Sequence, residues 1–266
     1  MKTVLRVALV LALAITSAAS LGCNKLRAKD RLNEGTRAYN RGSYPEAEKL
    51  FKESIDFNPE LIQARLYYAA AVRAQYLPGG ESAENVAIGN KAIKAYTEVI
   101  TTTKEQKHID AAHAFIAELH KGLGQKEEHR NWVLKRIQLP NQTDEVRAQS
   151  YYTLSVGYWE DSYTITQKYL IPRTQPPAYK PLKEWEQGDV EKVRDLVMKG
   201  LQHMEESLKI DPKYANSYSY RGLLYREQAK IETDVKVKAE LAEKADKDIE
   251  EFQRLNREAQ AQQTGQ

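Results

Sequence analysis

The chain has 266 residues, of which 41% are apolar and 29% charged, and its 40 basic and 37 acidic side chains leave a formal net charge of +3. These values are typical of a packed globular protein and exclude a largely disordered or collagen-like chain. The charge is too small for this length to form the clustered basic surface that nucleic-acid binding requires. A single cysteine excludes an intramolecular disulfide. We therefore expect one or two globular domains and no nucleic-acid partner.

Residues 1–22 have the pattern of a secretory signal peptide. Two basic residues, Lys2 and Arg6, precede an unbroken apolar run from Val7 to Ile15, and small residues follow it. At ~1.5 Å per residue this run covers about half of the ~30 Å hydrocarbon core, so it is too short for a membrane span. The sequence predicts that residues 1–22 direct export and are then removed.

The only cysteine, Cys23, follows this segment directly. The stretch Ser20-Leu21-Gly22-Cys23 resembles the lipobox of bacterial lipoproteins, in which the cysteine is acylated and the residues before it are cleaved off. The resemblance implies a lipid anchor at Cys23, and two or three acyl chains make such an anchor effectively permanent. In that pattern Asn24 favours the outer membrane, with the protein facing the periplasm. The alternatives are an ordinary signal peptide or a buried thiol without a role.

Beyond Cys23 the chain contains a repeated pattern of small residues and prolines. Ile55-Asp56-Phe57-Asn58-Pro59 returns 153 residues later as Leu208-Lys209-Ile210-Asp211-Pro212, and a small residue, Ala69 or Gly222, stands ten residues after each proline. Upstream of the first proline stand Gly35, Ala47 and Phe51. These intervals resemble the tetratricopeptide (TPR) repeat, a helix-turn-helix of about 34 residues. In this repeat small residues lie where two helices cross, and proline ends the second helix.

The resemblance implies an all-α fold, an α-α superhelix or TPR solenoid of about five helix pairs over residues 23–258. Apolar spacing and boundary residues predict first helices near 26–41, 60–76, 107–122, 143–161 and 213–230, and second helices near 44–57, 82–102, 125–138, 189–210 and 234–258. No run alternates with period two, so we expect essentially no sheet. Arg221 stands where the family prefers an apolar residue. From Arg254 the chain is polar and rich in glutamine, so we expect it to fray, with 259–266 as a polar tail.

An insertion near residues 162–188 enlarges the fourth helix pair. It contains Tyr163, Tyr169, Tyr179, Trp185 and four prolines. This composition is too aromatic for a solvated linker and too rich in proline for a helix. We expect the insertion to fold over one end of a binding groove, where its deletion would alter partner capture but leave the helices intact. The alternative is that it is structural and that its deletion unfolds the chain.

Motifs of catalytic chemistry are missing from the sequence: it has no phosphate-binding loop, nucleophile elbow, zinc-protease helix or paired-cysteine zinc site. The one cluster of metal-ligating side chains is histidine-rich. His113 and His120 are seven residues apart on one predicted helix, near His108 and His129, so they share a face that a transition metal could use. The alternative is that these are ordinary histidines of a helix pair. We expect no metal, no cofactor and no catalytic residue.

In TPR proteins the first helices line the concave inner surface, so the resemblance assigns partner-binding residues by position. The assigned residues are Tyr39, Arg73, Tyr152, Trp159, Asn216, Leu223 and Arg226, with Leu32 and Glu227 at further inward positions. Exposed aromatic side chains beside arginine are typical of binding hot spots. The alternative is that Tyr152 and Trp159 pack beneath the insertion. Leu32 and Thr36 replace the lysine and asparagine with which some TPR proteins clamp a partner's C-terminal carboxylate.

Taken together, these resemblances imply a lipid-anchored periplasmic scaffold of the bacterial cell envelope. It would bind a protein or peptide partner in the concave groove and catalyse no reaction. A narrower alternative is an assembly factor for an outer-membrane machine, acting in barrel insertion or on a pilus secretin. A metal-binding or enzymatic helical protein is the alternative from another class.

Overall fold

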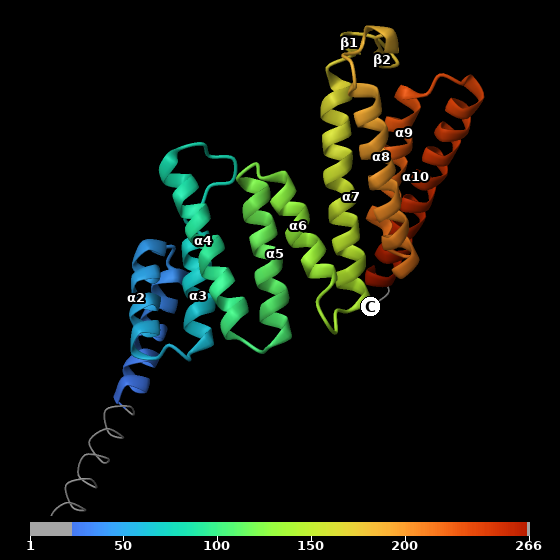
Figure 1. Ribbon diagram of the computed structural model, residues 1–266. Coiled ribbons are helices and arrows are strands. Elements are labelled where there is room, and N and C mark those ends of the chain that lie inside the picture. Colours follow the sequence, from blue (N-terminus) through green and yellow to red (C-terminus); the bar gives the residue numbers. More distant parts are fainter. Residues whose placement is uncertain (1–22, 265–266) are drawn as a thin grey trace, which may run out of the picture. The chain divides into compact units, whose positions relative to one another are not determined.

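The computed structural model describes residues 23–264, so the predicted signal segment, residues 1–22, lies outside the described residues. The chain divides into two compact units, of which the first ends at Trp132 and the second begins at Val133. Both units are built from helices that run up and down in pairs (Figure 1). Each unit is described by itself below.

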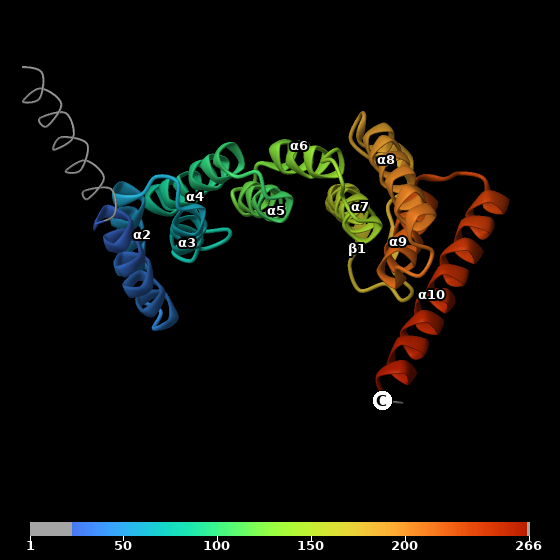
Figure 2. The same ribbon diagram turned by 90° about the horizontal axis from the view of Figure 1, so that it is seen from below.

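The first unit consists of four complete helices after a leading one. Residues 23–40 form that leading helix, and α2 (Tyr44–Phe57), α3 (Ile62–Arg73), α4 (Ala83–Thr102), α5 (Gln106–Gly122) and the first half of α6 (Lys126–Ile137) follow. Gly42 takes the positive φ of 79° that the turn before α2 requires. Ser82 caps α4 by accepting a hydrogen bond from the Asn85 N–H at 3.1 Å. Figure 2 shows α3 and α5 on the same side of α4.

Small residues allow the helices of the first unit to approach closely, as the sequence predicts. A Cβ added to Gly35 would lie 2.6 Å from Cε1 of Phe51, a side chain that is 1% exposed. Ala69 of α3 and Ala92 of α4 are fully buried in one core cluster. The backbones can therefore cross at these positions only while the side chains stay this small.

The second unit begins with the rest of α6 and contains three further long helices and the insertion. Its elements are α7 (Asp144–Gln167), β1 (Leu170–Ile171), β2 (Ala178–Tyr179), the 3₁₀ turn η1 (Leu182–Glu184), α8 (Asp189–Ile210), α9 (Ala215–Ile231) and α10 (Val235–Thr264). Ser155 of α7 donates a hydrogen bond to the Gly200 carbonyl of α8 at 2.7 Å. A Cβ on Gly222 would lie 3.1 Å from the Ala245 carbonyl of α10. Small residues thus mark the helix crossings of this unit as well.

The all-α fold of five helix pairs is confirmed in the described part of the chain. The pairs are residues 23–40 with α2, α3 with α4, α5 with α6, α7 with α8, and α9 with α10. Within residues 23–264 no helix has both the length and the apolar character that crossing a bilayer requires.

The insertion is a folded part of the core. The rings of Tyr169 and Trp185 stack with centroids 4.1 Å apart, and both side chains belong to the core cluster that includes Leu224 of α9. Tyr169 also donates a hydrogen bond to Asp189 at 2.8 Å, at the start of α8. Between these contacts, Leu170 pairs with Tyr179 in a short antiparallel ladder. This ladder of two residues per strand agrees with the expectation of essentially no sheet, and it is too short to leave an alternating pattern in the sequence.

Two helix ends differ from the prediction. Helix α7 continues to Gln167, so the first residues assigned to the insertion are helical. Helix α10 continues to Thr264, so residues 259–264, expected to form a polar tail, are helical. Arg254 forms ion pairs with Glu251 and Glu258, one turn before and after it on α10. Such pairs stabilise the exposed end of a helix that is otherwise polar.

Candidate functional site

Two hollows of the first unit are lined by residues on successive turns of α3. The first, which we call the aromatic notch, has a volume of about 210 Å³. It is lined by Thr36, Tyr39 and Asn40 of the leading helix, Phe51 of α2, and Tyr67 and Ala70 of α3. The rings of Phe51 and Tyr67 lie 5.5 Å apart, and Tyr67 is 37% exposed at the rim. An apolar side chain of a ligand could bury its surface here against three aromatic rings.

The second hollow, which we call the donor pocket, lies between the C-terminal ends of α3 and α5 and has a volume of about 510 Å³. It is lined by Arg73, Tyr76, Pro78, Gly79, Glu118, Leu119, Lys121 and Gly122. Its wall at residues 77–80 is fixed in place: Asn85 of α4 donates to the carbonyls of Leu77 and Gly80 at 2.8 Å each and accepts from the Leu77 N–H at 2.8 Å. The N–H of Gly79 donates to the Gly122 carbonyl at 3.1 Å.

Two polar groups of the donor pocket lack partners. The Tyr76 hydroxyl and Nε of Arg73 are buried and have no hydrogen-bond partner among the described residues. Burial is the main cause of the raised pKa of Tyr76, so the hydroxyl stays protonated and can donate at neutral pH. The Arg73 guanidinium lies 4.3 Å from the centroid of the Phe115 ring, which supports one of its faces.

The second unit carries a row of aromatic side chains along α7 and α9. In order, the row consists of Tyr214, Tyr152, Tyr220, Trp159 and Tyr163, and neighbouring ring centroids lie 5.2 to 5.4 Å apart. Burial is the main cause of a raised pKa at Tyr152, so its hydroxyl is protonated at any physiological pH. The indole N–H of Trp159 is buried and has no partner in the part of the chain described.

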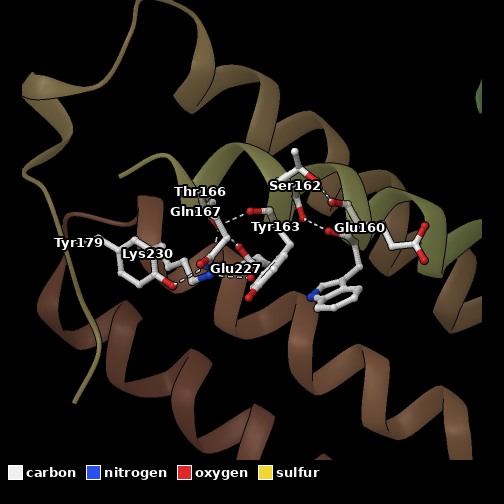
Figure 3. Close-up of polar contacts among 10 residues, drawn as sticks. Glu160, Ser162, Tyr163, Thr166, Gln167, Tyr179, Glu227 and Lys230 are labelled. Carbon is white, nitrogen blue, oxygen red and sulfur yellow. Dashed lines mark hydrogen bonds and ion pairs between the residues drawn. The ribbon is translucent and has the colours of Figure 1, made fainter. Parts of the chain in front are cut away.

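The row ends at a buried ion pair that ties the insertion to α9 (Figure 3). Nζ of Lys230 lies 2.6 Å from Oε1 of Glu227, and the two side chains are 13% and 4% exposed. Thr166 of α7 donates to Oε2 of Glu227 at 2.8 Å and accepts from Lys230 at 3.2 Å. The ammonium group also lies 5.3 Å from the Tyr163 ring centroid and 4.6 Å from that of Tyr179 in β2. One lysine therefore joins α7, α9 and the insertion.

Known structures identify the fold to which these elements belong. The MamA RS-1 ArsTM double mutant superposes with a TM-score of 0.53 over 88% of this chain and 97% of its own, at 14% identity. A crystal structure of MamA protein gives a TM-score of 0.50 over 86% of this chain and 94% of its own, also at 14% identity. Both are TPR structures. This chain has the TPR fold. No family model matches its sequence, and no curated protein matches it.

Within the TPR fold, the predicted groove residues fall into separate groups. Tyr39 and Arg73 line the two hollows of the first unit. Tyr152 and Trp159 belong to the aromatic row of the second unit, where both contact Tyr220. The repeat pattern does not identify Tyr220, because this residue stands between the positions at which TPR helices face inward.

Three further groove residues were predicted on α9. Asn216 is exposed in the first turn of α9, and Leu223 is half-buried. Arg226 is exposed and pairs with Asp246 of α10 at 3.2 Å, so it is held toward the neighbouring helix. None of these side chains takes part in the ring contacts of the row.

Two inward positions of the TPR pattern are wrong as groove residues. Leu32 is 6% exposed and packs in a core cluster with Phe51. Glu227 is 3% exposed and is the buried partner of Lys230. The position of a residue in the repeat does not reveal such burial, because neighbouring helices or an insertion cover these two side chains. Cys23, by contrast, is exposed at the beginning of the leading helix, so it is not a buried thiol.

The histidines of the third TPR pair are core residues. His113 and His129 are 7% and 6% exposed, and their Nδ1 atoms lie 2.8 Å and 2.9 Å from the carbonyls of Ile109 and Ala117. Nδ1 of His120 lies 2.6 Å from the Gln125 side-chain oxygen. Among residues 23–264 no three or more His, Cys, Asp or Glu side chains are grouped as metal ligands. The contacts account for these histidines as ordinary packing and hydrogen-bonding groups.

Proposed function

We propose that this TPR protein is a scaffold that binds an extended segment of a partner protein across the aromatic notch and the donor pocket. The observation that carries the proposal is that the two hollows adjoin one another along α3. Ala70 lines the first and Arg73 the second, and residues three apart lie on the same face of a helix. Aromatic and arginine side chains in such hollows are the residues that dominate binding energy at protein interfaces.

The proposal can be tested by placing a photoreactive amino acid at Tyr67, on the rim of the aromatic notch, in the protein as it occurs in cells. Illumination should yield one specific cross-linked partner, and the yield should fall when Tyr39→Ala and Arg73→Ala are combined. The control places the same photoreactive residue at Lys94, which is exposed and lies on α4 rather than on a first helix. Equal yields at the two positions, or none at Tyr67, would refute the proposed binding face.

We further propose that the scaffold is anchored by lipid at Cys23, in the outer membrane and facing the periplasm. Support comes from the signal-like segment before Cys23 and from the exposure of its side chain at the start of a helix. Because Cys23 itself is helical, the anchor would hold the first unit close to the membrane surface. Intact mass measurement of envelope-purified protein should find residues 1–22 removed and acyl chains added, and Cys23→Ser should release the protein from the membrane. An unacylated mature chain would contradict this part of the proposal.

A further inference from the structure

The donor pocket contains two hydrogen-bond donors that pair with no acceptor among residues 23–264. Buried polar groups in proteins are nearly always paired, because leaving one unpaired loses its hydrogen bonds to water without replacing them. Here the hydroxyl of Tyr76, a side chain that is 8% exposed, and Nε of Arg73 are unpaired in the same pocket. Two unpaired donors that line one pocket are available to an acceptor that a ligand supplies.

The Tyr76 ring is held so that its hydroxyl cannot easily turn away. A Cβ on Gly122 of α5 would lie 2.8 Å from the Tyr76 hydroxyl, and a Cβ on Gly89 of α4 would lie 3.0 Å from the ring. The ring therefore packs directly against the backbone of two helices. The wall formed by residues 77–80 is hydrogen-bonded to Asn85, so the pocket is built before any ligand arrives. A preformed pocket loses little conformational entropy on binding.

The charge of the pocket favours an anion. Arg73 is half-buried and forms no ion pair among the described residues, and Lys121 adds a second positive charge at the exposed rim. Glu118 is the one carboxylate that lines the pocket, and it is exposed. Donors that include a guanidinium make their strongest hydrogen bonds to ionised oxygen.

We propose that the donor pocket binds the carboxylate of an aspartate or glutamate within the partner segment, beside an apolar side chain that occupies the aromatic notch. This inference rests on the proposed function and names the ligand chemistry of its site. The carboxylate accepts hydrogen bonds from Tyr76 and Arg73 and supplies the counter-charge that Arg73 lacks. A neutral backbone carbonyl would pair with the donors but would leave the charge of Arg73 uncompensated.

Three substitutions separate this role from a structural one. Tyr76→Phe removes only an unpaired hydroxyl, so the free protein should keep or slightly raise its melting temperature while affinity for the segment falls about tenfold. Arg73→Gln should weaken binding at least as much. Glu118→Gln removes the competing carboxylate and should strengthen binding. A merely structural role for Tyr76 would lower the melting temperature and would not distinguish acidic from neutral segments.

The experiment is a selection of random peptides displayed with their C-terminus fused to a carrier, using the purified protein as bait. Peptides that bind the wild type should be enriched in Asp or Glu near an apolar residue, and this enrichment should disappear with Tyr76→Phe or Arg73→Gln as bait. Binders without acidic enrichment, or enrichment that survives both substitutions, would overturn the inference while leaving the proposed function intact.

Two other outcomes are also decisive. If binders emerge only from a library with free C-termini, the pocket takes a terminal carboxylate and the inference of an internal acidic residue is wrong. If neither library yields binders and cross-linking at Tyr67 also yields no partner, the proposed function fails together with the inference.

Discussion

Replacing Glu227 with glutamine should destabilise the second unit by about 3 kcal/mol, because it leaves the charge of Lys230 buried without its partner. The two side chains are 4% and 13% exposed and their charged atoms lie 2.6 Å apart, so solvent can replace little of the lost interaction. The expected cost is at the lower end of the range for broken buried ion pairs, since the contacts of Lys230 with the Tyr163 and Tyr179 rings remain.

Urea denaturation followed by tryptophan fluorescence can measure this loss, since the second unit contains Trp159 and Trp185 and the first unit contains Trp132. Replacing Trp132 with phenylalanine would leave only reporters of the second unit. The double variant Glu227→Gln with Lys230→Met should cost less than the single one, because no charge then stays buried. The matched control is Asp195→Asn, which breaks an exposed ion pair with Lys199 and should cost below about 0.5 kcal/mol. A Glu227→Gln variant as stable as this control would refute the reasoning.

Three further predictions concern packing and pH. Gly35→Ala should destabilise the first unit by about 1–3 kcal/mol, because the new Cβ would lie 2.6 Å from the buried Phe51 ring. Gly157→Ala, within α7, should stabilise the second unit by about 0.5–1 kcal/mol, because no atom lies within 4 Å of the new Cβ. Chemical denaturation of both variants tests this pair. Trp185→Ala should cost about 3–5 kcal/mol and lower helical circular dichroism on mild heating, and unchanged melting would show that the insertion is not structural. Burial lowers the pKa of His203, so the folded state resists protonation of this side chain. The stability of the fold should therefore decrease as the pH drops through the unfolded-state pKa of about 6.5. Melting temperatures measured from pH 8 to 5 should depend less on pH in a His203→Phe variant.

The fold was predictable from the sequence because its determinants are local. Pro59 and Pro212 end helices, and small residues such as Gly35 and Gly222 mark crossings that the structure contains. The sequence also indicated one departure from the repeat pattern, at Arg221. The structure explains it: Arg221 forms two hydrogen bonds with Asp248 of α10, at 2.8 Å and 2.6 Å, so a charged pair replaces the apolar contact of the usual repeat.

The site was predictable only in part, because its geometry depends on contacts between distant segments. The repeat pattern assigns Tyr39 and Arg73 to inward positions, and in the structure both line hollows. Tyr76 was not found, because it follows the end of α3 and becomes a pocket residue only through Gly89, Gly122 and the loop held by Asn85. A tyrosine just beyond a helix end, followed by Pro-Gly-Gly, was the only local signal.

The insertion shows the same limit. Its aromatic residues were recognised as unusual, but their partners lie on α7, α8 and α9, at sequence separations that no local pattern encodes. Trp185 packs on Tyr169 and donates a hydrogen bond to the Lys180 carbonyl at 3.0 Å, so the segment also makes contacts within itself. Whether it also alters partner capture remains the prediction made from its composition.

The most direct test of the proposed binding face is hydrogen–deuterium exchange of the protein with and without the partner segment captured at Tyr67. We predict added protection at the end of the leading helix, along residues 67–80 and at the C-terminal end of α5, where the notch and the donor pocket lie. Protection confined to α2 and α4, or to the second unit alone, would contradict the account.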